Sequence, residues 1–393
     1  MNSSVRMGLA VVILAVSATA GYGQSRITIL SDQSQKPQGP LSRQVRELVG
    51  NLGTPPVAKG LDRSDPDAWE ILFATNRVAS TDDNGDVEFD DDAGPLVYGR
   101  STVSLSNSRL RPGRRPRVRS TAVVANSAFY DRLNELVRAS VDHDVLLFVH
   151  GYNVDFESAV QRASQIGQDM PFSGAIVSYS WPSHGSLRNY RTDEKMVQSS
   201  IRPFAEFLAE LIESVPASTR LNILVHSMGN RAVLGALNRL PESLRDRTPF
   251  QHIVFAAPDV AAETFRLQVK AATKLAHHVT LYACSDDTAL KASRQLHRDP
   301  RRPWVQIERA GDATHPVVEQ GLHTIDVSAV DTSFMGHTYY GNNKTVLTDL
   351  LYQFKRDRQP DQCPWLHRVS TAEGSYWKMD KRRMAIMSVS QPH

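Results

Sequence analysis

The sequence predicts an α/β protein built on a mostly parallel sheet with helices on both faces. Short, wholly apolar runs such as 144–149 and 221–225 alternate with longer amphipathic segments. Wholly apolar runs are typical of strands that are buried on both sides. In the segments between them, apolar residues recur at helical spacing, as at Phe129, Leu133 and Val137. Helices that connect buried strands in this way favour a parallel arrangement.

The elements are expected in the following order. Two strand-like runs open the compact part, at 69–77 and 98–105, and the alternating pattern begins near residue 127. The predicted helices are 128–141, 156–168, 191–213, 230–238, 261–276 and 342–354. The predicted strands are 144–149, 174–179, 221–225, 252–256, 279–283 and 324–328. We find no internal repeat, so a solenoid or propeller is excluded.

Composition narrows the class of protein. The chain has 393 residues, which allows one large domain or two smaller ones. A mean hydropathy of −0.35 argues against a membrane protein with many spans. The net charge of +3 is too small for a globally basic nucleic-acid-binding protein. Only two cysteines are present, which excludes a disulfide scaffold and an array of zinc fingers.

The first 20 residues have the layout of a signal peptide. Arg6 precedes an apolar run at 7–16, and small residues follow at 18–20. The run is shorter than the ~20 residues of a spanning helix, although an uncleaved membrane anchor remains an alternative. We therefore expect a periplasmic or secreted protein. In an oxidising compartment Cys284 and Cys363 could pair, and the sequence leaves this open.

The rest of the chain divides into three parts. Residues 21–65 are expected to form a linker, 66–355 the folded domain and 356–393 a polar C-terminal tail. The acidic stretch 82–92 lacks EF-hand spacing, so we interpret it as a solvated loop. The basic stretch 109–119 lacks interleaved aromatic residues, so a solvated loop is favoured over a nucleic-acid surface. Peripheral association with the cell envelope is an alternative role for it.

Ser227 is the candidate nucleophile. An apolar strand runs directly into His226-Ser-Met-Gly229, and a helix is expected to follow at once. A serine on a tight strand-to-helix turn is held with its oxygen exposed above the sheet. Val225 stands where the G-x-S-x-G pattern has its first glycine. The alternative is a serine that caps the following helix.

A second strand end, Phe148 to Asn153, carries the His150-Gly151 pair. A glycine here lets the backbone turn so that an N–H faces a reacting carbonyl oxygen. The backbone N–H groups of Tyr152 and Met228 are the candidate donors of an oxyanion hole. Such a donor is typically worth roughly 3–4 kcal/mol in the transition state. The alternative for His150 is a core histidine that orders the loop, and we expect it both to do this and to border the site.

The serine needs a base, and His337 fits best. It follows the predicted strand 324–328 and precedes the last helix. His226 adjoins the serine, but neighbouring side chains on a sharp turn diverge. Three other histidines, His277, His278 and His323, come before their strands and therefore at the wrong end.

Two carboxylates are candidates for the acid that orients the base. Asp287 follows the strand 279–283, and Asp259 follows the strand 252–256. Both loops open at the sheet edge that carries Ser227. We favour Asp287, because the acid commonly follows the penultimate strand. Asp259 is the alternative acid, and it could instead cap the next helix.

Taken together, these segments resemble the α/β-hydrolase superfamily. More narrowly, the chain resembles a bacterial family of uncharacterised esterase- and lipase-like hydrolases. The likeness covers about residues 69–355. It is carried by segments 73–77, 148–153, 180–183, 225–230, 257–259, 287–290 and 336–337. It implies a doubly wound sheet of about eight strands and a Ser-His-Asp triad of Ser227, His337 and Asp287.

The resulting expectation is a serine hydrolase of carboxylic esters, acyl lipids among them, that needs no metal or other cofactor. Its partner would be a small ester or lipid, and no nucleic acid. His150, Gly151 and Trp181 would line the pocket, and 184–194 could lie over its mouth. An amidase or acyltransferase would use the same groups. A non-catalytic binding protein on the same scaffold is a further alternative. Oligomeric state is left open.

Overall fold

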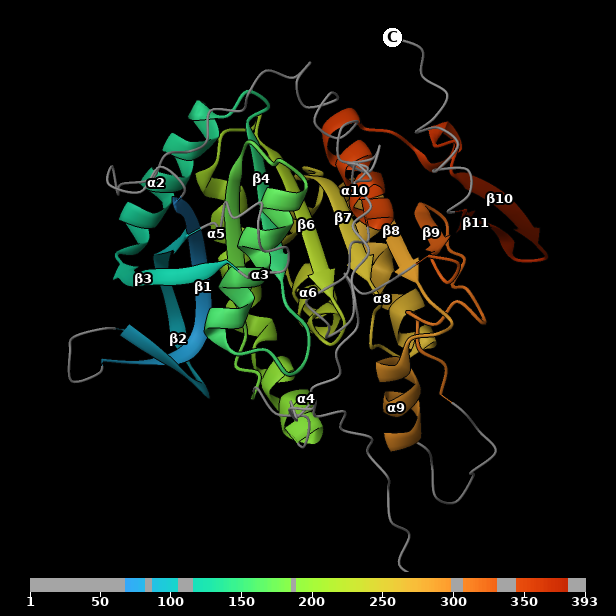
Figure 1. Cartoon of the computed structure of the whole chain (residues 1–393), viewed down its shortest axis with the longest axis horizontal. Coiled ribbons are helices and arrows are strands. Elements are labelled where there is room, and N and C mark those ends of the chain that lie inside the picture. Colours follow the sequence, from blue (N-terminus) through green and yellow to red (C-terminus); the bar gives the residue numbers. More distant parts are fainter. Residues whose placement is uncertain are drawn as a thin grey trace, which may run out of the picture. The chain divides into compact units, whose positions relative to one another are not determined.

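The computed structural model describes residues 68–81, 87–104, 116–184, 189–297, 307–330 and 344–380. The expected signal peptide and linker, His337, and parts of the acidic and basic stretches lie outside these residues. Within them, eleven strands form one sheet in the order β10-β11-β9-β8-β7-β6-β4-β5-β1-β2-β3 (Figure 1). The predicted doubly wound, mostly parallel sheet is therefore confirmed, with more strands than the expected eight.

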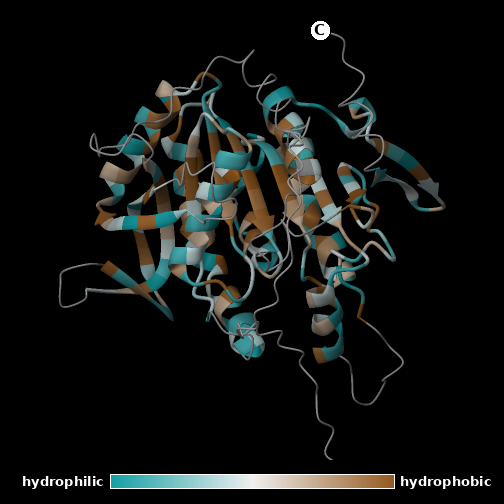
Figure 2. Ribbon diagram, viewed as in Figure 1, coloured by the Kyte–Doolittle hydropathy of each residue, from teal (hydrophilic) through white to brown (hydrophobic). Residues whose placement is uncertain are grey.

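The strands span the following residues: β1 Ala68–Thr81, β2 Val87–Ser104, β3 Arg117–Val124, β4 Asp144–Val149, β5 Ala175–Ser180, β6 Arg220–His226, β7 Phe250–Ala256, β8 Ala276–Ala283, β9 Leu322–Asp326, β10 Leu366–Thr371 and β11 Gly374–Met379. Pairing is parallel from β1 through β5, β4, β6, β7, β8 and β9 to β11. Among the strands described, the β1–β2, β2–β3 and β10–β11 pairs are antiparallel. Apolar residues are concentrated on the central strands (Figure 2).

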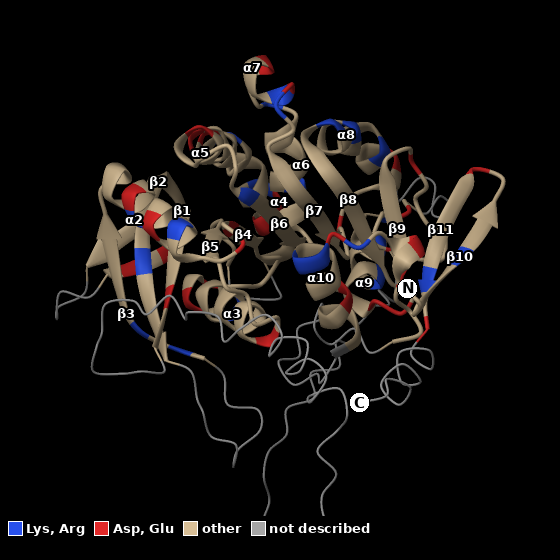
Figure 3. Ribbon diagram, turned by 90° about the horizontal axis from the view of Figure 1, so that it is seen from above, with Lys and Arg blue, Asp and Glu red and all other residues tan. Residues whose placement is uncertain are grey.

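The helices span the following residues: α2 Asn126–Ala139, α3 Phe156–Asp169, α4 Tyr190–Ser199, α5 Ile201–Ser214, α6 Gly229–Leu237, α7 Glu242–Arg245, α8 Ala262–Leu275, α9 Thr288–Leu296 and α10 Lys344–Arg356. One core cluster joins the sheet to α2, α5, α6 and α8, and a second joins the opposite face to α3 and α10 (Figure 3). Among the described residues, no helix is long and apolar enough to cross a membrane.

The order of the strands positions the site. From β4 the chain steps outward to β5, then returns through α4 and α5 to β6 on the other side of β4. The carboxyl ends of β4 and β6 are therefore neighbours at the point where the winding reverses. In open α/β sheets, ligands bind in the crevice at such a switch point. The loops after β4 and β6 are those that carry His150 and Ser227.

Three expectations about the elements are wrong. The predicted helix 191–213 is two helices, with Ser200 between α4 and α5. Pro203 falls in the first turn of α5, where its missing N–H removes no helical bond. Within the acidic stretch 82–92, residues 87–92 belong to β2, and within the basic stretch 109–119, Arg117 and Arg119 belong to β3. These strands lie at the sheet edge, where charged side chains are tolerated.

The expected polar tail also contains structure. Residues 366–379 form the β10–β11 hairpin, which turns at Gly374 with a φ of 138°. Trp377 and Met379 of β11 are buried in the core cluster that contains α10. Cys284 and Cys363 are both buried in that same cluster, and neither takes part in a disulfide.

Candidate active site

Ser227 sits on a strained turn between β6 and α6. Its φ is +51°, in the left-handed region that residues other than glycine seldom adopt. The turn is held by backbone bonds: Ser227 N–H donates to Ala256 O at 2.9 Å, and Ser227 O accepts from Asn230 N at 3.2 Å. Asn230 Nδ2 also donates to Ser227 O, at 2.7 Å. The predicted strand-to-helix turn is therefore present, and such retained strain is typical of functional positions.

The helix-cap interpretation of Ser227 is less well supported. The N-cap position of α6 is Met228, and it has no side-chain capping bond. Val225, which replaces the first glycine of the pattern, is fully buried in the core cluster of α6 and α8. Its bulk is thus accommodated by the core, away from the open side of the turn.

Two glycines bring the loop after β4 against this turn. A Cβ on Gly229 would lie 2.2 Å from His150 O, and a Cβ on Gly151 would lie 2.8 Å from Ser227 Cβ. Either side chain would force the backbone apart. Because Ser227 N–H is bonded to Ala256 O, it is not available to a substrate oxygen. The N–H groups of Tyr152 and Met228 therefore remain the candidate donors.

His150 orders its loop and is unsuited to be the base. Its ring is buried, and burial together with the nearby charge of Arg77 lowers its pKa to about 3. Nδ1 lies 2.8 Å from Gly151 O, and Nε2 lies 3.2 Å from Ser180 Oγ. The ring stacks on Trp181 at 5.1 Å, and Trp181 Nε1 donates to His150 O at 2.9 Å. Trp181 has no exposed surface, and through this stack and hydrogen bond it supports the loop.

Arg77 is a member of this region that the sequence analysis did not single out. It ends the predicted strand 69–77, and its side chain is completely buried. Nε donates to Ser180 Oγ at 2.9 Å, and Nη2 donates to Val154 O at 2.8 Å. Nη1 forms an ion pair with Asp91 at 2.8 Å. The available signal was an arginine that closes a strand-like run whose centre, residues 71–74, is apolar.

Asp287 caps a helix at the carboxyl edge of the sheet. It precedes α9, and its Oδ1 accepts from the N–H groups of Ala289 at 2.9 Å and Leu290 at 3.0 Å. Its neighbour Asp286 is largely exposed and pairs with Lys291 at 3.5 Å. Asp287 thus follows β8 as expected, with its position fixed by a cap.

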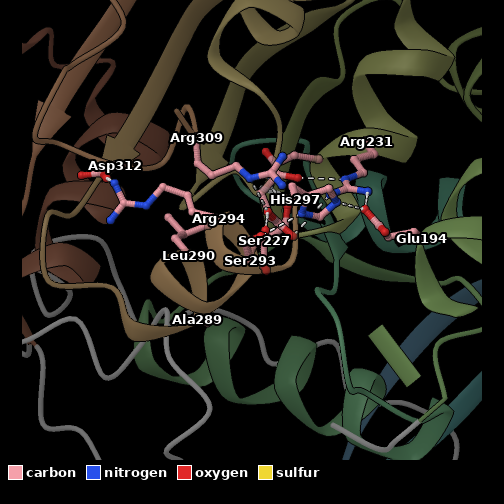
Figure 4. A network of polar contacts seen from close by, with 12 residues as sticks. Glu194, Ser227, Arg231, Ala289, Leu290, Ser293, Arg294, His297, Arg309 and Asp312 are labelled. Carbon is pink, nitrogen blue, oxygen red and sulfur yellow. Dashed lines mark hydrogen bonds and ion pairs between the residues drawn. The ribbon is translucent and has the colours of Figure 1, made fainter. Parts of the chain in front are cut away.

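Asp259 is committed to a buried polar network. Figure 4 shows this network, with Arg231, Ser293 and Arg309 labelled. Oδ1 accepts from Ser293 Oγ at 2.6 Å and lies 3.4 Å from Arg309 Nε. Oδ2 accepts from the Tyr190 hydroxyl and lies 3.5 Å from Arg231 Nη2. The contacts from Ser293, Tyr190 and Arg231 are hydrogen bonds, and Arg309 adds a buried positive charge at ion-pair distance. Arg231 extends the network to Glu194 at 2.6 Å, and His297 Nε2 meets the same carboxylate at 2.6 Å.

The expected base, His337, lies outside the described residues. It follows β9, whose carboxyl end is at the same sheet edge as Ser227. The histidines set aside as bases lie as expected: His277 and His278 open β8, and His323 is the second residue of β9. They are therefore at the amino edge of the sheet, away from Ser227.

One group of metal-binding residue types occurs among the described residues, at the amino edge. Ligand atoms of His252, His278 and Asp357 lie within 4.8 Å of one another. Asp357 is already engaged, with His252 Nε2 at 2.8 Å, Gln251 Nε2 at 3.0 Å and Arg220 Nη1 at 3.1 Å. These contacts explain why the three residues lie together, because they hold the chain just after α10 against the sheet.

Comparisons with known proteins give the following findings. No curated protein matches the sequence. Among solved structures, the fold is similar to a dienelactone hydrolase from Anabaena variabilis, at 11% identity over 74% of this chain and 98% of that one, with a TM-score of 0.35. A cold-adapted esterase from an Arctic intertidal metagenomic library matches at 14% identity over 75% and 98%, with a TM-score of 0.35. A phospholipase, PlaB, from Legionella pneumophila matches at 9% identity over 60% and 68%, with a TM-score of 0.28.

The family comparison is more direct. Residues 125–354 match the model of a family described as alpha/beta hydrolase of unknown function (DUF900). This segment holds the turn at Ser227, the loop of His150 and both candidate acids. It is more than half of the chain, and the chain therefore belongs to this family of α/β hydrolases.

Proposed function

We propose that the protein is a serine hydrolase that cleaves carboxylic esters through an acyl-enzyme. The observation that carries this proposal is the left-handed Ser227, held on a strand-to-helix turn with Gly151 packed against it. This arrangement supports a serine hydroxyl at the switch point of the sheet, with the backbone N–H groups of the two adjoining loops as candidate oxyanion donors. It is the geometry that an attacking hydroxyl and a developing oxyanion require.

In this mechanism, Ser227 Oγ attacks the ester carbonyl while His337 takes its proton. The oxyanion accepts hydrogen bonds from the N–H groups of Tyr152 and Met228. His337 then gives the proton to the leaving alcohol, and the acyl group stays on Ser227. A water molecule, activated in turn by His337, releases the acid. No metal or cofactor takes part in these steps.

Asp287 is the better candidate for the acid that holds His337. Asp259 is already held by hydrogen bonds from Tyr190, Ser293 and Arg231 and by the charge of Arg309. The helix cap instead fixes Asp287 at the start of α9, at the carboxyl edge of the sheet. Its place after β8, next to the β9 strand that precedes His337, fits the role of the acid.

Labelling of the full-length protein with a fluorophosphonate probe tests the proposal. We expect the wild type to be labelled, and Ser227→Ala and His337→Ala not to be. If the folded wild type is not labelled, the hydrolase mechanism fails and a non-catalytic binding role takes its place. A labelled enzyme would next be given p-nitrophenyl esters of rising chain length, matched anilides, and an added alcohol or amine. Faster turnover of anilides would identify an amidase, and capture of the acyl group would identify an acyltransferase.

We further propose that the chain is exported, with residues 1–20 removed as a signal peptide. The arrangement of Arg6, the apolar run 7–16 and the small residues 18–20 supports this. N-terminal sequencing of the protein from a periplasmic or culture fraction tests it. A sequence beginning at Met1 in the membrane fraction would instead support an uncleaved anchor.

A further inference from the structure

A series of hydrogen-bonded side chains leads from the buried Arg77 to the loop after β4, which carries Gly151 and Tyr152. In this series, Arg77 Nε lies 2.9 Å from Ser180 Oγ, and Ser180 Oγ lies 3.2 Å from His150 Nε2. His150 Nδ1 then lies 2.8 Å from Gly151 O. All three side chains are buried, with exposures of 0%, 0% and 1%. Bulk water is therefore not available to supply or replace these bonds.

The direction of each hydrogen bond follows from the chemistry of its two ends. Gly151 O is a carbonyl and can only accept, so His150 Nδ1 carries the hydrogen. The low pKa of His150 keeps the ring neutral, so Nε2 has no hydrogen and must accept. Ser180 O–H is then the donor to Nε2. Arg77 Nε–H can only donate, and it gives its hydrogen to the lone pair of Ser180 Oγ. The three bonds thus point one way, from Arg77 to the Gly151 carbonyl.

The last bond fixes the donor that the mechanism uses. Gly151 C=O and Tyr152 N–H belong to one peptide unit. The described chain has no cis peptide, so this C=O and N–H point in opposite directions. When His150 holds the Gly151 oxygen, the Tyr152 N–H points in the opposite direction within the same peptide plane. Gly151 packs directly against Ser227 Cβ, so this orientation is decided within a few ångströms of the nucleophile.

Arg77 also ties down the far end of the same loop. Nη2 donates to Val154 O at 2.8 Å, and Nη1 donates to Ser183 O at 3.2 Å. Val154 N–H in turn donates to Ser183 Oγ at 3.2 Å. One guanidinium, rigid and permanently charged, therefore contacts both the loop after β4 and the loop after β5.

We infer that Arg77, Ser180 and His150 form a directional hydrogen-bond relay that orients the Gly151–Tyr152 peptide as an oxyanion donor. The three are positioning residues, and the inference rests on the proposed function. The charge of Arg77 polarises the bonds in sequence, which strengthens each of them in a low-dielectric interior. The relay favours the transition state and leaves binding of the uncharged ester nearly unchanged.

Ser180→Ala is the most direct test, because it removes the middle donor and little volume. We expect kcat on a p-nitrophenyl ester to fall about tenfold, less than the loss from removing an entire oxyanion donor, and KM to change less than twofold. The affinity for a trifluoromethyl ketone, which forms a tetrahedral adduct on the serine, should fall by a similar factor. Ser180→Thr keeps the hydroxyl and should restore both quantities.

Ser178→Ala is the matched control. Ser178 lies two residues earlier on β5, on the same side of the strand, and is completely buried. Its Oγ is a buried oxygen without a hydrogen-bond partner among the described residues. We expect this variant to keep the wild-type kcat and ketone affinity. Equal losses in both variants, or none in Ser180→Ala, would overturn the relay.

A second readout does not depend on turnover. Nitrogen NMR of histidine-labelled protein, with His150→Gln to assign the signal, reports which ring nitrogen carries the hydrogen. We expect the Nδ1–H form in the wild type and a shifted Nε2 signal in Ser180→Ala. An Nε2–H form in the wild type would contradict the relay even in an active enzyme. If the wild type is neither active nor labelled by fluorophosphonate, the proposed function fails, and the tautomer still decides the direction of the bonds.

Discussion

A histidine and an arginine lie at the amino ends of the parallel strands (the amino edge), and another such pair lies at their carboxyl ends (the carboxyl edge). The two pairs are arranged differently. At the amino edge, His252 and Arg220 meet directly at a carboxylate, that of Asp357. At the carboxyl edge, Arg77 and His150 are separated by a neutral serine, and His150 faces a backbone carbonyl. The first set is a closed ion pair that fastens α10. The second is a series of hydrogen bonds that ends at the Gly151 carbonyl, in the loop beside Ser227. The charge of Asp357 and Arg220 holds α10 on the sheet, and in the proposed mechanism the charge of Arg77 orients an oxyanion donor.

The strongest way to test this division is Ser227→Ala. Removal of the nucleophile should lower kcat by at least about ten-thousand-fold, and the melting temperature should stay close to that of the wild type. The checks are ester hydrolysis and thermal unfolding of the two proteins side by side. Substantial residual turnover that tracks the purified variant would exclude Ser227 as the nucleophile.

Asp287→Asn should give the next largest loss. Asparagine is as good a helix cap as aspartate, so α9 keeps its start. It cannot stabilise the imidazolium of His337, and kcat should fall by roughly a thousand- to ten-thousand-fold. Kinetics and thermal unfolding together separate these effects. Activity within a few fold of the wild type would rule out Asp287 as the acid.

Asp259→Asn should act mainly on stability. It leaves Arg231 and Arg309 without their shared carboxylate in a buried site. Breaking a buried ion pair in this way typically costs about 3–5 kcal/mol. Denaturant unfolding measures the loss, with Asp287→Asn as the matched control. A fully stable variant with a large loss of kcat would instead make Asp259 the catalytic acid.

The two buried histidines predict a pH dependence of the same sign at both edges. Burial lowers the pKa of His150 to about 3 and also lowers the pKa of His252. The unfolded value is about 6.5, so protonation favours the unfolded chain. This part of the stability is complete above pH 6.5 and is lost as the pH falls from there toward 3. Denaturant unfolding of His150→Gln and His252→Gln between pH 4.5 and 7.5 should each show a shallower slope than the wild type. If both variants show the same dependence of unfolding free energy on pH as the wild type, this explanation is wrong.

The smallest expected effect belongs to Asp357→Asn at the amino edge. Asp357 is partly exposed, and it loses its charge but keeps an oxygen that can accept hydrogen bonds. We expect a loss of about 1–2 kcal/mol in the free energy of unfolding and no change in kcat. Unfolding and kinetics at neutral pH measure the two. A fall in kcat without a loss of stability would show that the two edges are not independent.

The sequence predicted the parts of the site that depend on local pattern. The turn at Ser227 and the loop at His150 each follow an apolar strand within a few residues, and that spacing is visible in a single chain. Arg77 and Ser180 are 103 positions apart, and nothing in either segment indicates that they meet. The β10–β11 hairpin was missed because few of its side chains are buried, so its pattern is mostly polar. Contacts at long range, and strands at the edge of a sheet, leave little periodic signal.

The position of Arg77 has a practical consequence for the choice of boundaries when a fragment of this protein is expressed. The family match begins at residue 125. β1, which contains Arg77 and pairs with β5, lies entirely before that boundary. A protein trimmed to 125–354 would keep Ser227 and both candidate acids. It would lose the guanidinium that contacts the loops after β4 and β5, and it would expose β5 to pairing with other chains. For the isolated domain to be informative, its N-terminal boundary must lie no later than residue 68.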